Sequence, residues 1–396
     1  MLKRDGVFYP LCGLLIVTAL VLRYLGLPMR NPDMDNAVGY LSWFDYVVTH
    51  GRFAALKDNF YNYPPFYIYL LDLISYLDGL APRIALIKFL SFAFELIAAF
   101  IVFKIVVRQT VDARRAILAA LLFLNLPTLI MNGAYWGQCD IIFTTFLLAF
   151  AWALIAGRPV VAMAMFSMAL SIKVQAIFAA PFVVYLLLKR IAPLWTVILP
   201  PLVYTVLALP AALAGRGWIN LLMIYADQAA TPHKLSARAP NIYLFVQHFI
   251  PEGLFPVATI AGILLAGAVS LWVLWTHLRQ HVPPPAIWIV AALALWLALE
   301  PSLLPKIHER YFFGADMFAF LFAVLMPRAW WVAALFQVGS ALAYLYFMTI
   351  EYDLGIDFHG AAFFGAAAAI PATIGLAWYY RRLTPPVLSL TIPPSL

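Results

Sequence analysis

The chain has 396 residues, of which 65% are hydrophobic, 16% aromatic and only 11% charged. A soluble protein carries about a quarter charged residues, so this composition excludes a soluble globular domain. Two cysteines, Cys12 and Cys139, lie in different apolar segments and exclude a disulfide framework or a cysteine-based metal cluster. The formal net charge of +7 does not indicate nucleic-acid binding, because Lys and Arg in a membrane protein mostly record topology.

Apolar runs recur along the whole chain at the length that crosses a bilayer as a helix, roughly 17–25 residues. They predict an all-α polytopic membrane protein with about twelve transmembrane helices. The first run follows a basic flank, and no small-x-small cleavage site follows it, so we expect a retained helix. The expected spans lie near residues 6–26, 84–104, 114–131, 140–156, 159–172, 176–188, 191–212, 254–276, 285–303, 311–326, 329–349 and 361–379.

Basic residues set the predicted orientation, because cytoplasmic loops carry an excess of Lys and Arg. On the path that places these residues inside, both termini are cytoplasmic and nearly all acidic residues lie at the outer face. We therefore expect a protein of the cell inner (plasma) membrane, with its chemistry on the periplasmic or extracytoplasmic side. The basic residues that set this path are Lys3, Arg4, Lys104, Arg108, Arg114, Arg115, Arg158, Lys189, Arg190, Arg279, Arg328, Arg381 and Arg382.

The same path predicts one transmembrane domain over residues 1–382, followed by a cytoplasmic tail at 383–396. Two long outer loops interrupt the domain, at 27–82 and at 214–253. The apolar stretch PPFYIYLLDLISYLDGL, residues 64–80, is short and carries an aspartate at its centre. Counting it as a span would place the basic loop after it outside, so we interpret it as a helix on the outer membrane surface.

Two aspartates stand in the first outer loop, within NPDMDNAVGYLSWFDYVVTHGRF (31–53). Asp33 and Asp35 flank Met34 just before a helical stretch. A carboxylate at a membrane surface serves as a general base or a metal ligand, and the alternative is a helix cap. Later in the same loop Tyr63 stands in NYPPFYIY, where two prolines stiffen a turn.

Polar residues recur at the outer ends of four consecutive expected spans, in NGAYWGQCD (132–140) and SIKVQA (171–176). Two of those spans are short, and short helices leave a depression in the outer leaflet that a lipid-linked head group can enter. Lys173 falls on the outer side of the path, so topology does not explain it; the alternative is a lysine that snorkels to the surface. The polar residues of the two motifs are Asn132, Gln138, Asp140, Lys173 and Gln175.

The stretch LLPKIHERYFFGAD, residues 303–316, concentrates ionisable groups between two apolar runs. Charges this close to apolar spans are costly unless they are paired or functional. Arg and Lys suit a phosphate, His can donate to a leaving oxygen, and Glu can orient either cation; the alternative is an ion-pair cluster without chemistry. This stretch supplies Lys306, His308, Glu309 and Arg310, and HKLSARAPNIYLF (233–245) adds Arg238 and Asn241 in the second outer loop.

In chain order the motifs are an acidic first outer loop, Y-P-P, W-G-Q-x-D, K-x-Q-A, A-P-N-I-Y and H-E-R-Y-F-F. Together, over about residues 31–320, they resemble the bacterial members of the GT-C superfamily. These are membrane glycosyltransferases that use polyprenyl-phosphate-linked sugars. The resemblance implies two surface helices in the first outer loop and a catalytic aspartate in the same loop.

The resemblance favours Asp35 as that aspartate, because the family's acid stands about two helical turns before a motif like WFDYV. The Asp-x-Asp form is also similar to the first mannosyltransferase of glycolipid-anchor synthesis. Relatives often carry Ser-Gly-Asp before the helix, whereas this chain has Asp33-Met34-Asp35. The choice between Asp33 and Asp35 therefore stays open.

The implied reaction is the inverting transfer of a hexose from a polyprenyl-phosphate donor to an acceptor hydroxyl. Asp35 would take the acceptor's proton while cationic side chains stabilise the departing lipid phosphate. Side-chain cations make a cofactor unnecessary, although a divalent metal at Asp33 and Asp35 stays open. The expected phosphate ligands are Lys173, His308, Arg310, Lys306 and Arg238, and the expected substrate contacts are Tyr63, Gln138, Asp140, Gln175, Asn241 and Glu309.

Mannose is the favoured sugar, ahead of glucose or galactose, and the acceptor is a lipid, a growing glycan or a protein. The expected partners are the polyprenyl-phosphate-linked sugar, this acceptor and membrane lipids, without nucleic acid. One alternative is a secondary transporter with Asp140, Lys173 and Asp316 as an ion relay, but transporters place such groups near the bilayer midplane. Another is a polymerase or ligase that uses polyprenyl-diphosphate oligosaccharides, which needs a similar basic surface.

Overall fold

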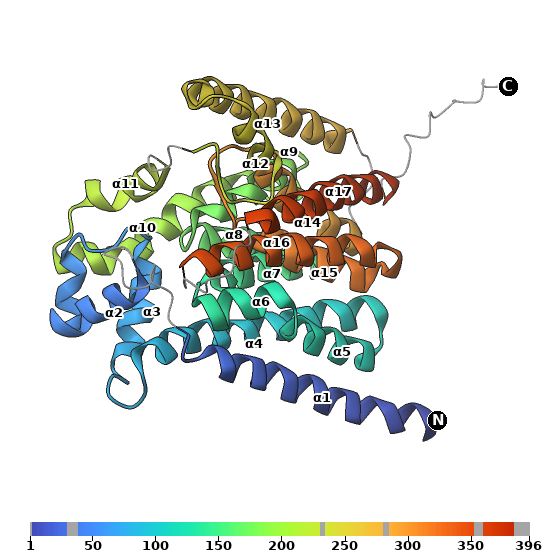
Figure 1. The fold of residues 1–396 in the computed structure, drawn as a ribbon, viewed down its shortest axis with the longest axis horizontal. Helices are drawn as coiled ribbons and strands as arrows, with labels where there is room; N and C mark the ends of the chain where they lie inside the picture. The colour runs from blue at the N-terminus through green and yellow to red at the C-terminus, as the bar shows by residue number, and fades with distance from the viewer. Residues whose placement is uncertain (1, 30–38, 230–233, 280–284, 352–358, 384–396) are drawn as a thin grey trace.

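The computed structural model describes residues 2–29, 39–229, 234–279, 285–351 and 359–383. Asp33 and Asp35 lie outside the described residues, so their predicted roles stay predictions. Helices dominate the described chain, and most run along the long axis of the molecule (Figure 1). The expected all-α membrane architecture is confirmed.

Each expected span falls on a helix. From the N-terminus to the middle of the chain, the elements are α1 (Leu2–Gly26), α2 (Tyr40–Thr49), η2 (Arg52–Lys57), α3 (Pro65–Ser75), α4 (Arg83–Thr110), α5 (Ala113–Leu124), α6 (Pro127–Ile130), η3 (Met131–Trp136), α7 (Asp140–Ile155), α8 (Pro159–Leu170), η4 (Val174–Ala179) and α9 (Ala180–Leu188). The remaining elements are η5 (Leu194–Ile198), α10 (Leu199–Ala214), α11 (Trp218–Ala229), β1 (Ser236–Ala237), α12 (Ile242–Phe249), η6 (Glu252–Leu254), α13 (Phe255–Leu278), α14 (Ala286–Leu303), β2 (Ile307–His308), α15 (Phe313–Leu325), η7 (Pro327–Ala329), α16 (Trp330–Glu351) and α17 (His359–Leu383).

The helices differ in whether they are long enough to cross a membrane. Within the described residues, 7 helices are long and apolar enough, and a bent pair makes up to 8. Helices α7, α8 and α15, and the continuous η4–α9 segment, are apolar but shorter, at 10–17 residues. The expected count of twelve spans therefore stays a prediction.

The bent pair interrupts the span that the sequence predicts over 114–131. Helix α5 ends at Leu124, Asn125 caps it, and Pro127 begins α6, because proline has no N–H to continue the hydrogen-bonded ladder. The two parts meet at 47°, and η3 continues the second part as a π-helix. Such widened turns often occur at functional sites, and this one carries the sequence from Met131 to Trp136.

Helices α2 and α3 lie between α1 and α4 in sequence and gather with α11 at one end of the molecule (Figure 1). Helix α3 has 11 residues and is therefore about 16 Å long, well short of the roughly 30 Å hydrocarbon core. Its Tyr67 ring packs 5.0 Å from the ring of Tyr40 on α2. The structure thus has the two short helices that the resemblance implies in this loop.

Burial separates the centre of the bundle from its edge. Helix α14 has 72% of its apolar window buried inside the protein, whereas α1 and α13 have 11% each. A helix that is apolar on all sides and buried belongs to the core, and an exposed apolar helix faces lipid. Figure 1 accordingly shows α1 and α13 along opposite edges.

Small residues let α16 and α17 cross closely. A Cβ added to Gly339 would lie 2.9 Å from the backbone oxygen of Gly365, and one added to Gly365 would lie 2.7 Å from that of Gly339. Such contacts are typical of helix pairs in membranes. This crossing fixes α16, which carries Phe347, an aromatic residue of the site described below.

A short parallel ladder joins two distant loops. Strand β1 pairs with β2, so that Ser236 lies opposite Ile307 and Ala237 opposite His308. The Lys306 amide also donates to the Leu235 carbonyl at 2.7 Å. The ladder brings the second outer loop against the charged 303–316 stretch.

Candidate active site

A buried ion pair joins two of the sequence motifs. Lys173, in the turn after α8, contacts the carboxylate of Asp140 at the first residue of α7. The amide of Asn132 on η3 donates to the other Asp140 oxygen at 2.8 Å. Lys173 is only 1% exposed, so the alternative interpretation of a snorkelling lysine is wrong. Burial disfavours the charge of Lys173, but the Asp140 carboxylate outweighs this and holds the Lys173 pKa above its ordinary value.

Two arginines flank a stacked aromatic pair. The rings of Trp136 on η3 and Phe347 on α16 stack at 4.3 Å. The Arg310 guanidinium lies 5.5 Å from the centre of the Trp136 ring, and that of Arg238 lies 5.3 Å from the Phe347 ring. Both distances suit a cation–π interaction, so the aromatic pair positions two cations from different loops.

Arg310 has unused hydrogen-bonding capacity. Its guanidinium is 3.7 Å from the Glu309 carboxylate, a loose ion pair. Its Nε is buried and has no hydrogen-bond partner among the described residues. A buried donor without a partner is costly, and an anionic ligand would satisfy it.

His308 lies among these cations. Its Nδ1 is 3.9 Å from Glu309, and its side chain is 38% exposed. Burial, followed by the positive charges of Arg310, Lys173 and Arg238, lowers the pKa of His308 to about 3. The imidazole is therefore neutral near pH 7 and keeps one N–H to donate. Arg310, Lys173 and Arg238 therefore all lie within electrostatic range of His308.

Tyrosines form a wall beside the ion pair. The Tyr40 hydroxyl donates to the Gln138 side chain at 2.7 Å and lies 3.1 Å from the Tyr63 hydroxyl. Burial raises the pKa of Tyr40 well above its ordinary value, so the hydroxyl keeps its proton. Lys173 Nζ is 5.1 Å from the centre of the Tyr63 ring. Tyr63 and Gln138, both expected substrate contacts, thus lie beside the Asp140–Lys173 pair.

Three other expected site residues have different surroundings. Asn241 is fully buried; its amide donates to the carbonyls of Pro301 and Leu304 at 3.0 and 3.3 Å, and its oxygen caps α12. Gln175 is buried, and its Oε1 has no partner among the described residues. Lys306 has a left-handed backbone with φ of 62°, and its side chain makes no hydrogen bond or ion pair within the described part of the chain. The predicted roles of Asn241, Gln175 and Lys306 stay predictions.

Two residues that the sequence analysis left without a role help to build the site. Trp136 stands inside the W-G-Q-C-D motif, but an apolar side chain at this position is typical of a core residue. Tyr40 stands just before WFDYV and looks like an ordinary surface-helix aromatic. The motif context was a signal for Trp136, whereas nothing in the sequence marks Tyr40 as a neighbour of Gln138.

Cations gather at the site. Among the described residues, Lys173, Arg238 and Arg310 all act on His308, and the carboxylates of Asp140 and Glu309 lie beside Lys173 and Arg310. Among the described residues, no group of three or more His, Cys, Asp or Glu could hold a metal ion. The clustered cations and the buried Arg310 Nε, which has no partner among the described residues, suit an anion, and planar guanidinium groups favour a phosphate or carboxylate.

The family model and the fold both place this helical bundle in one class, the membrane glycosyltransferases of the GT-C superfamily. Residues 60–301 match the family model of glycosyltransferase family 87, and the chain belongs to this family. The matched range contains Tyr63, Asp140 and Lys173; the Asp33–Asp35 pair and the 303–316 stretch lie outside it.

The fold is also similar to a solved structure, described as ArnT from Cupriavidus metallidurans bound to undecaprenyl phosphate. The TM-score is 0.53 at 17% sequence identity, and the likeness covers 93% of this chain and 76% of that one. At this identity the likeness shows the fold. No curated protein matches the sequence.

Proposed function

We propose that this membrane glycosyltransferase moves a hexose, with mannose favoured, from a polyprenyl-phosphate donor to an acceptor hydroxyl at the extracytoplasmic face. The observation that carries the proposal is the buried Arg310 guanidinium, which lies near Lys173 and His308 and whose Nε has no hydrogen-bond partner among the described residues. A structure of the same fold is described as bound to undecaprenyl phosphate, a lipid with the required phosphate. The comparison supports the donor class and leaves the sugar open.

The cations would act on the leaving group. As the bond from the sugar to the phosphate breaks, negative charge grows on the phosphate oxygens. Arg310 has a free Nε–H among the described residues, and neutral His308 has one N–H; both can donate to this charge. Because these groups are held in place by the aromatic pair and the β1–β2 ladder, little reorganisation is needed during the reaction.

The acceptor's proton needs a base, and the chain on both sides of the Asp33–Asp35 segment is anchored near the site. Before the segment, Lys88 donates to the carbonyl of Met29 at 2.6 Å and to that of Tyr135 at 3.4 Å. After it, Tyr40 donates to Gln138. Asp35 is five residues from Tyr40, so the covalent chain keeps their Cα atoms within about 18 Å of each other. This anchoring supports Asp35 as the base, with Asp33 as the other choice.

The test uses purified protein in nanodiscs with a panel of polyprenyl-phosphate sugars: mannose, glucose, galactose. We expect one donor to be consumed, and the product to have the inverted anomeric configuration. Asp35→Asn should lower transfer by about a hundred- to ten-thousandfold, because the amide cannot take a proton, while donor binding persists. Asp33→Asn is the matched control and should have a milder effect.

Each contrary result has a separate meaning. An inactive Asp33→Asn beside an active Asp35→Asn would assign the base to Asp33. Full activity of both variants would show that neither aspartate of the first outer loop is the base. Consumption of a diphosphate-linked oligosaccharide, with no monophosphate donor used, would support the polymerase or ligase instead. Loss of transfer on chelation, restored by a divalent ion, would assign a metal to the reaction.

A further inference from the structure

A side chain of α16 caps the start of α6. The break at Asn125–Leu126 leaves the first N–H groups of α6 without acceptors in their own helix, and the apolar Leu126 at the capping position makes no side-chain bond to them. Gln337 supplies the acceptor from 209 residues further along the chain. Its Oε1 accepts from the Thr128 backbone N–H at 3.1 Å and from the Thr128 hydroxyl at 3.0 Å. Thr128 is fully buried and Gln337 is 8% exposed, so this cap is shielded from water.

The same helix also holds the other end of the segment formed by α6 and η3. The ring of Phe347 stacks on Trp136 at 4.3 Å, and the ring of Tyr344 meets Trp136 edge-on at 5.5 Å. Gln337, Tyr344 and Phe347 are seven and three residues apart, so they lie on one face of α16. Helix α16 therefore contacts the α6–η3 segment both at its first turn and at its last residue.

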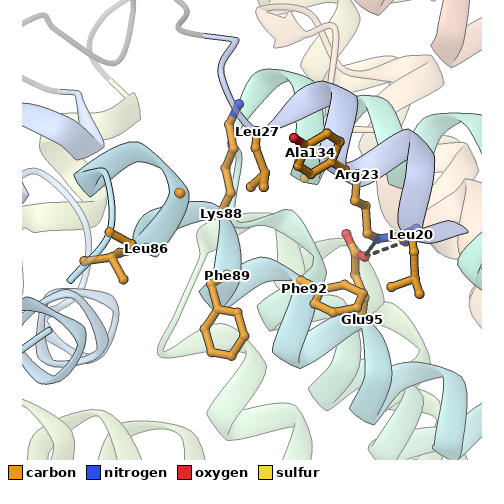
Figure 2. A pocket seen from close by; sticks show the side chains of 13 residues that line it. Leu20, Arg23, Leu27, Leu86, Lys88, Phe89, Phe92, Glu95 and Ala134 are labelled. Carbon is orange, nitrogen blue, oxygen red and sulfur yellow. Dashed lines mark hydrogen bonds and ion pairs between the residues drawn. The ribbon is translucent and has the colours of Figure 1, made fainter.

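The opposite side of η3 is only partly packed. A cavity of about 490 Å³ lies there between α1, α4 and η3, and Gly133 and Ala134 line it. Figure 2 shows Ala134 near the Arg23–Glu95 ion pair. Close contact on this side occurs at the end of α1, where a Cβ on Gly26 would lie 2.7 Å from the Ala134 carbonyl oxygen. The direction in which the segment leaves the break therefore depends largely on the contacts with α16.

A small change of direction at Thr128 becomes larger at the anion site. Asn132, which donates to Asp140, follows Thr128 by four residues. Trp136, whose ring lies 5.5 Å from the Arg310 guanidinium, follows it by eight. At about 1.5 Å per residue Trp136 lies roughly 12 Å along the axis, so a tilt of about 10° would move it by about 2 Å. A misplacement of about 1 Å can cost about a hundredfold in rate.

The Gln337 amide is not an efficient source of stability. Its Nε2 is buried and has no hydrogen-bond partner among the described residues. A buried amide that uses only its oxygen loses part of the benefit of its hydrogen bonds to desolvation, so an apolar side chain could hold the helices together about as well. The contact is better explained by direction, because an acceptor at one point fixes how α6 is oriented and an apolar contact does not.

We propose that Gln337 is a positioning residue of the anion site: it sets the direction of η3, whose Asn132 and Trp136 hold Asp140 and Arg310. The inference rests on the proposed function, because the anion is taken to be the donor phosphate. Gln337 acts through η3 and is not itself assigned to the substrate. Its loss should therefore disturb the site as well as the stability of the fold.

The test removes the acceptor and uses a native cysteine as the reporter of η3. Gln337→Met keeps the length of the side chain and removes the oxygen. Ser270→Ala is the matched control, because Ser270 Oγ donates to Glu300 at 2.7 Å and so joins α13 to α14 instead of α16 to α6. Cys139 is fully buried three residues after η3, so its alkylation by a maleimide reports local opening of this part of the protein. Cys12→Ser is present in every sample, so that only Cys139 can react.

The expected results separate positioning from stability. Gln337→Met should raise the alkylation rate of Cys139 by about five- to a hundredfold, the effect of leaving one buried N–H without an acceptor. It should also weaken the binding of undecaprenyl phosphate in nanodiscs by about tenfold, because a displaced Arg310 loses part of a charge-assisted contact. Ser270→Ala should lower the unfolding temperature and match wild type in both measurements.

Variants of Thr128 keep the test open if Gln337→Met does not fold. Thr128→Val loses the hydroxyl and keeps the backbone N–H, so it should show a smaller rise in the alkylation rate. Thr128→Ser keeps both donors and should restore the wild-type values. Equal rates in Thr128→Val and Thr128→Ser would contradict the cap.

Two results with Gln337→Met would overturn the inference. Cys139 reactivity equal to that of Ser270→Ala would show that Gln337 only adds stability. Faster alkylation with wild-type affinity for undecaprenyl phosphate would show that η3 moves without changing the anion site. A wild-type protein that does not bind undecaprenyl phosphate would contradict the proposed function instead, and the cysteine measurement, which needs no donor, would then decide the inference.

Discussion

Two buried ion pairs in this protein look alike and have different surroundings. Arg23 and Glu95 join α1 to α4, and Lys173 and Asp140 join the turn after α8 to α7. All four residues are less than a tenth exposed. In the first pair every guanidinium nitrogen has a protein acceptor. The second pair lies beside Arg310, whose Nε has no partner in the described residues.

The difference teaches that burial of charge does not by itself mark a functional site. A buried pair whose hydrogen bonds are complete holds helices together and offers nothing to a ligand. A buried guanidinium with an unsatisfied N–H among the described residues is unfavourable without a ligand, so it favours the binding of an anion there. We therefore expect changes in the first pair to act on stability and changes around the second to act on donor binding.

The largest effect should come from breaking the saturated pair. Glu95→Ala leaves Arg23 buried without its carboxylate, and removing one partner of a buried pair costs roughly 3–5 kcal/mol. We expect a marked fall in the unfolding temperature in detergent and in the yield of folded protein. Donor affinity per folded molecule should stay at the wild-type value. Glu95→Gln keeps an acceptor for Arg23 and should lose less stability.

A stable Glu95→Ala variant with weakened donor affinity would contradict the comparison. It would place the Arg23–Glu95 pair in the donor site. The residues between the two pairs, on η3, would then have to transmit the change.

A smaller effect should follow from removing a cation of the cluster. Arg310→Ala deletes a charged donor to the phosphate, which costs roughly 1.5–3 kcal/mol, or about ten- to a hundredfold in donor affinity. Arg216→Ala is a matched control, because Arg216 also lies over an aromatic ring, 3.8 Å from the centre of Tyr61, and bonds Asn59. Binding is measured with a polyprenyl-phosphate sugar by microscale thermophoresis. Equal donor affinity in wild type and Arg310→Ala would move the phosphate away from this cluster.

Helix positions could be predicted from the sequence because they depend on the length of apolar runs. Each expected span falls on a helix. The one clear departure is the break at Asn125–Leu126: the sequence shows Pro127, but it does not tell whether a proline bends a span or ends it. Helix α3 has only 11 residues, as a surface helix can, but α8 and α15 are nearly as short, so the surface-helix interpretation of 64–80 stays a prediction.

The geometry of the site could not be predicted in the same way. Lys173 and Asp140 stand in separate motifs, and their pairing depends on how α7 and α8 pack. Phe347 lies in an ordinary apolar run, so nothing in the sequence marks it as the partner of Trp136. Contacts between residues far apart in the chain are set by tertiary packing, which local patterns do not encode.

The smallest expected effect is the pH dependence of stability that His308 causes at the second ion pair. The folded pKa of His308 is about 3, below its ordinary value of 6.5, so between these values the folded protein binds fewer protons at this side chain than the unfolded protein. Stability from this group is therefore complete above about pH 6.5 and is lost as the pH falls toward 3. Because the side chain is 38% exposed, solvent screening keeps the effect small, on the order of 1 °C in unfolding temperature between pH 7 and pH 5.

His308→Gln should remove this share of the acid sensitivity, whereas His50→Gln, on the exposed end of α2, should follow wild type. Polyprenyl phosphate should also reduce the acid sensitivity of wild type, because a bound anion offsets the charges of Arg310, Lys173 and Arg238 and raises the pKa of His308. The measurement is the unfolding temperature in nanodiscs at pH 5, 6 and 7, with and without the lipid. Identical pH profiles for wild type and His308→Gln would mean that the imidazole is not affected by the charges of Arg310, Lys173 and Arg238, and this would contradict the proposed anion site.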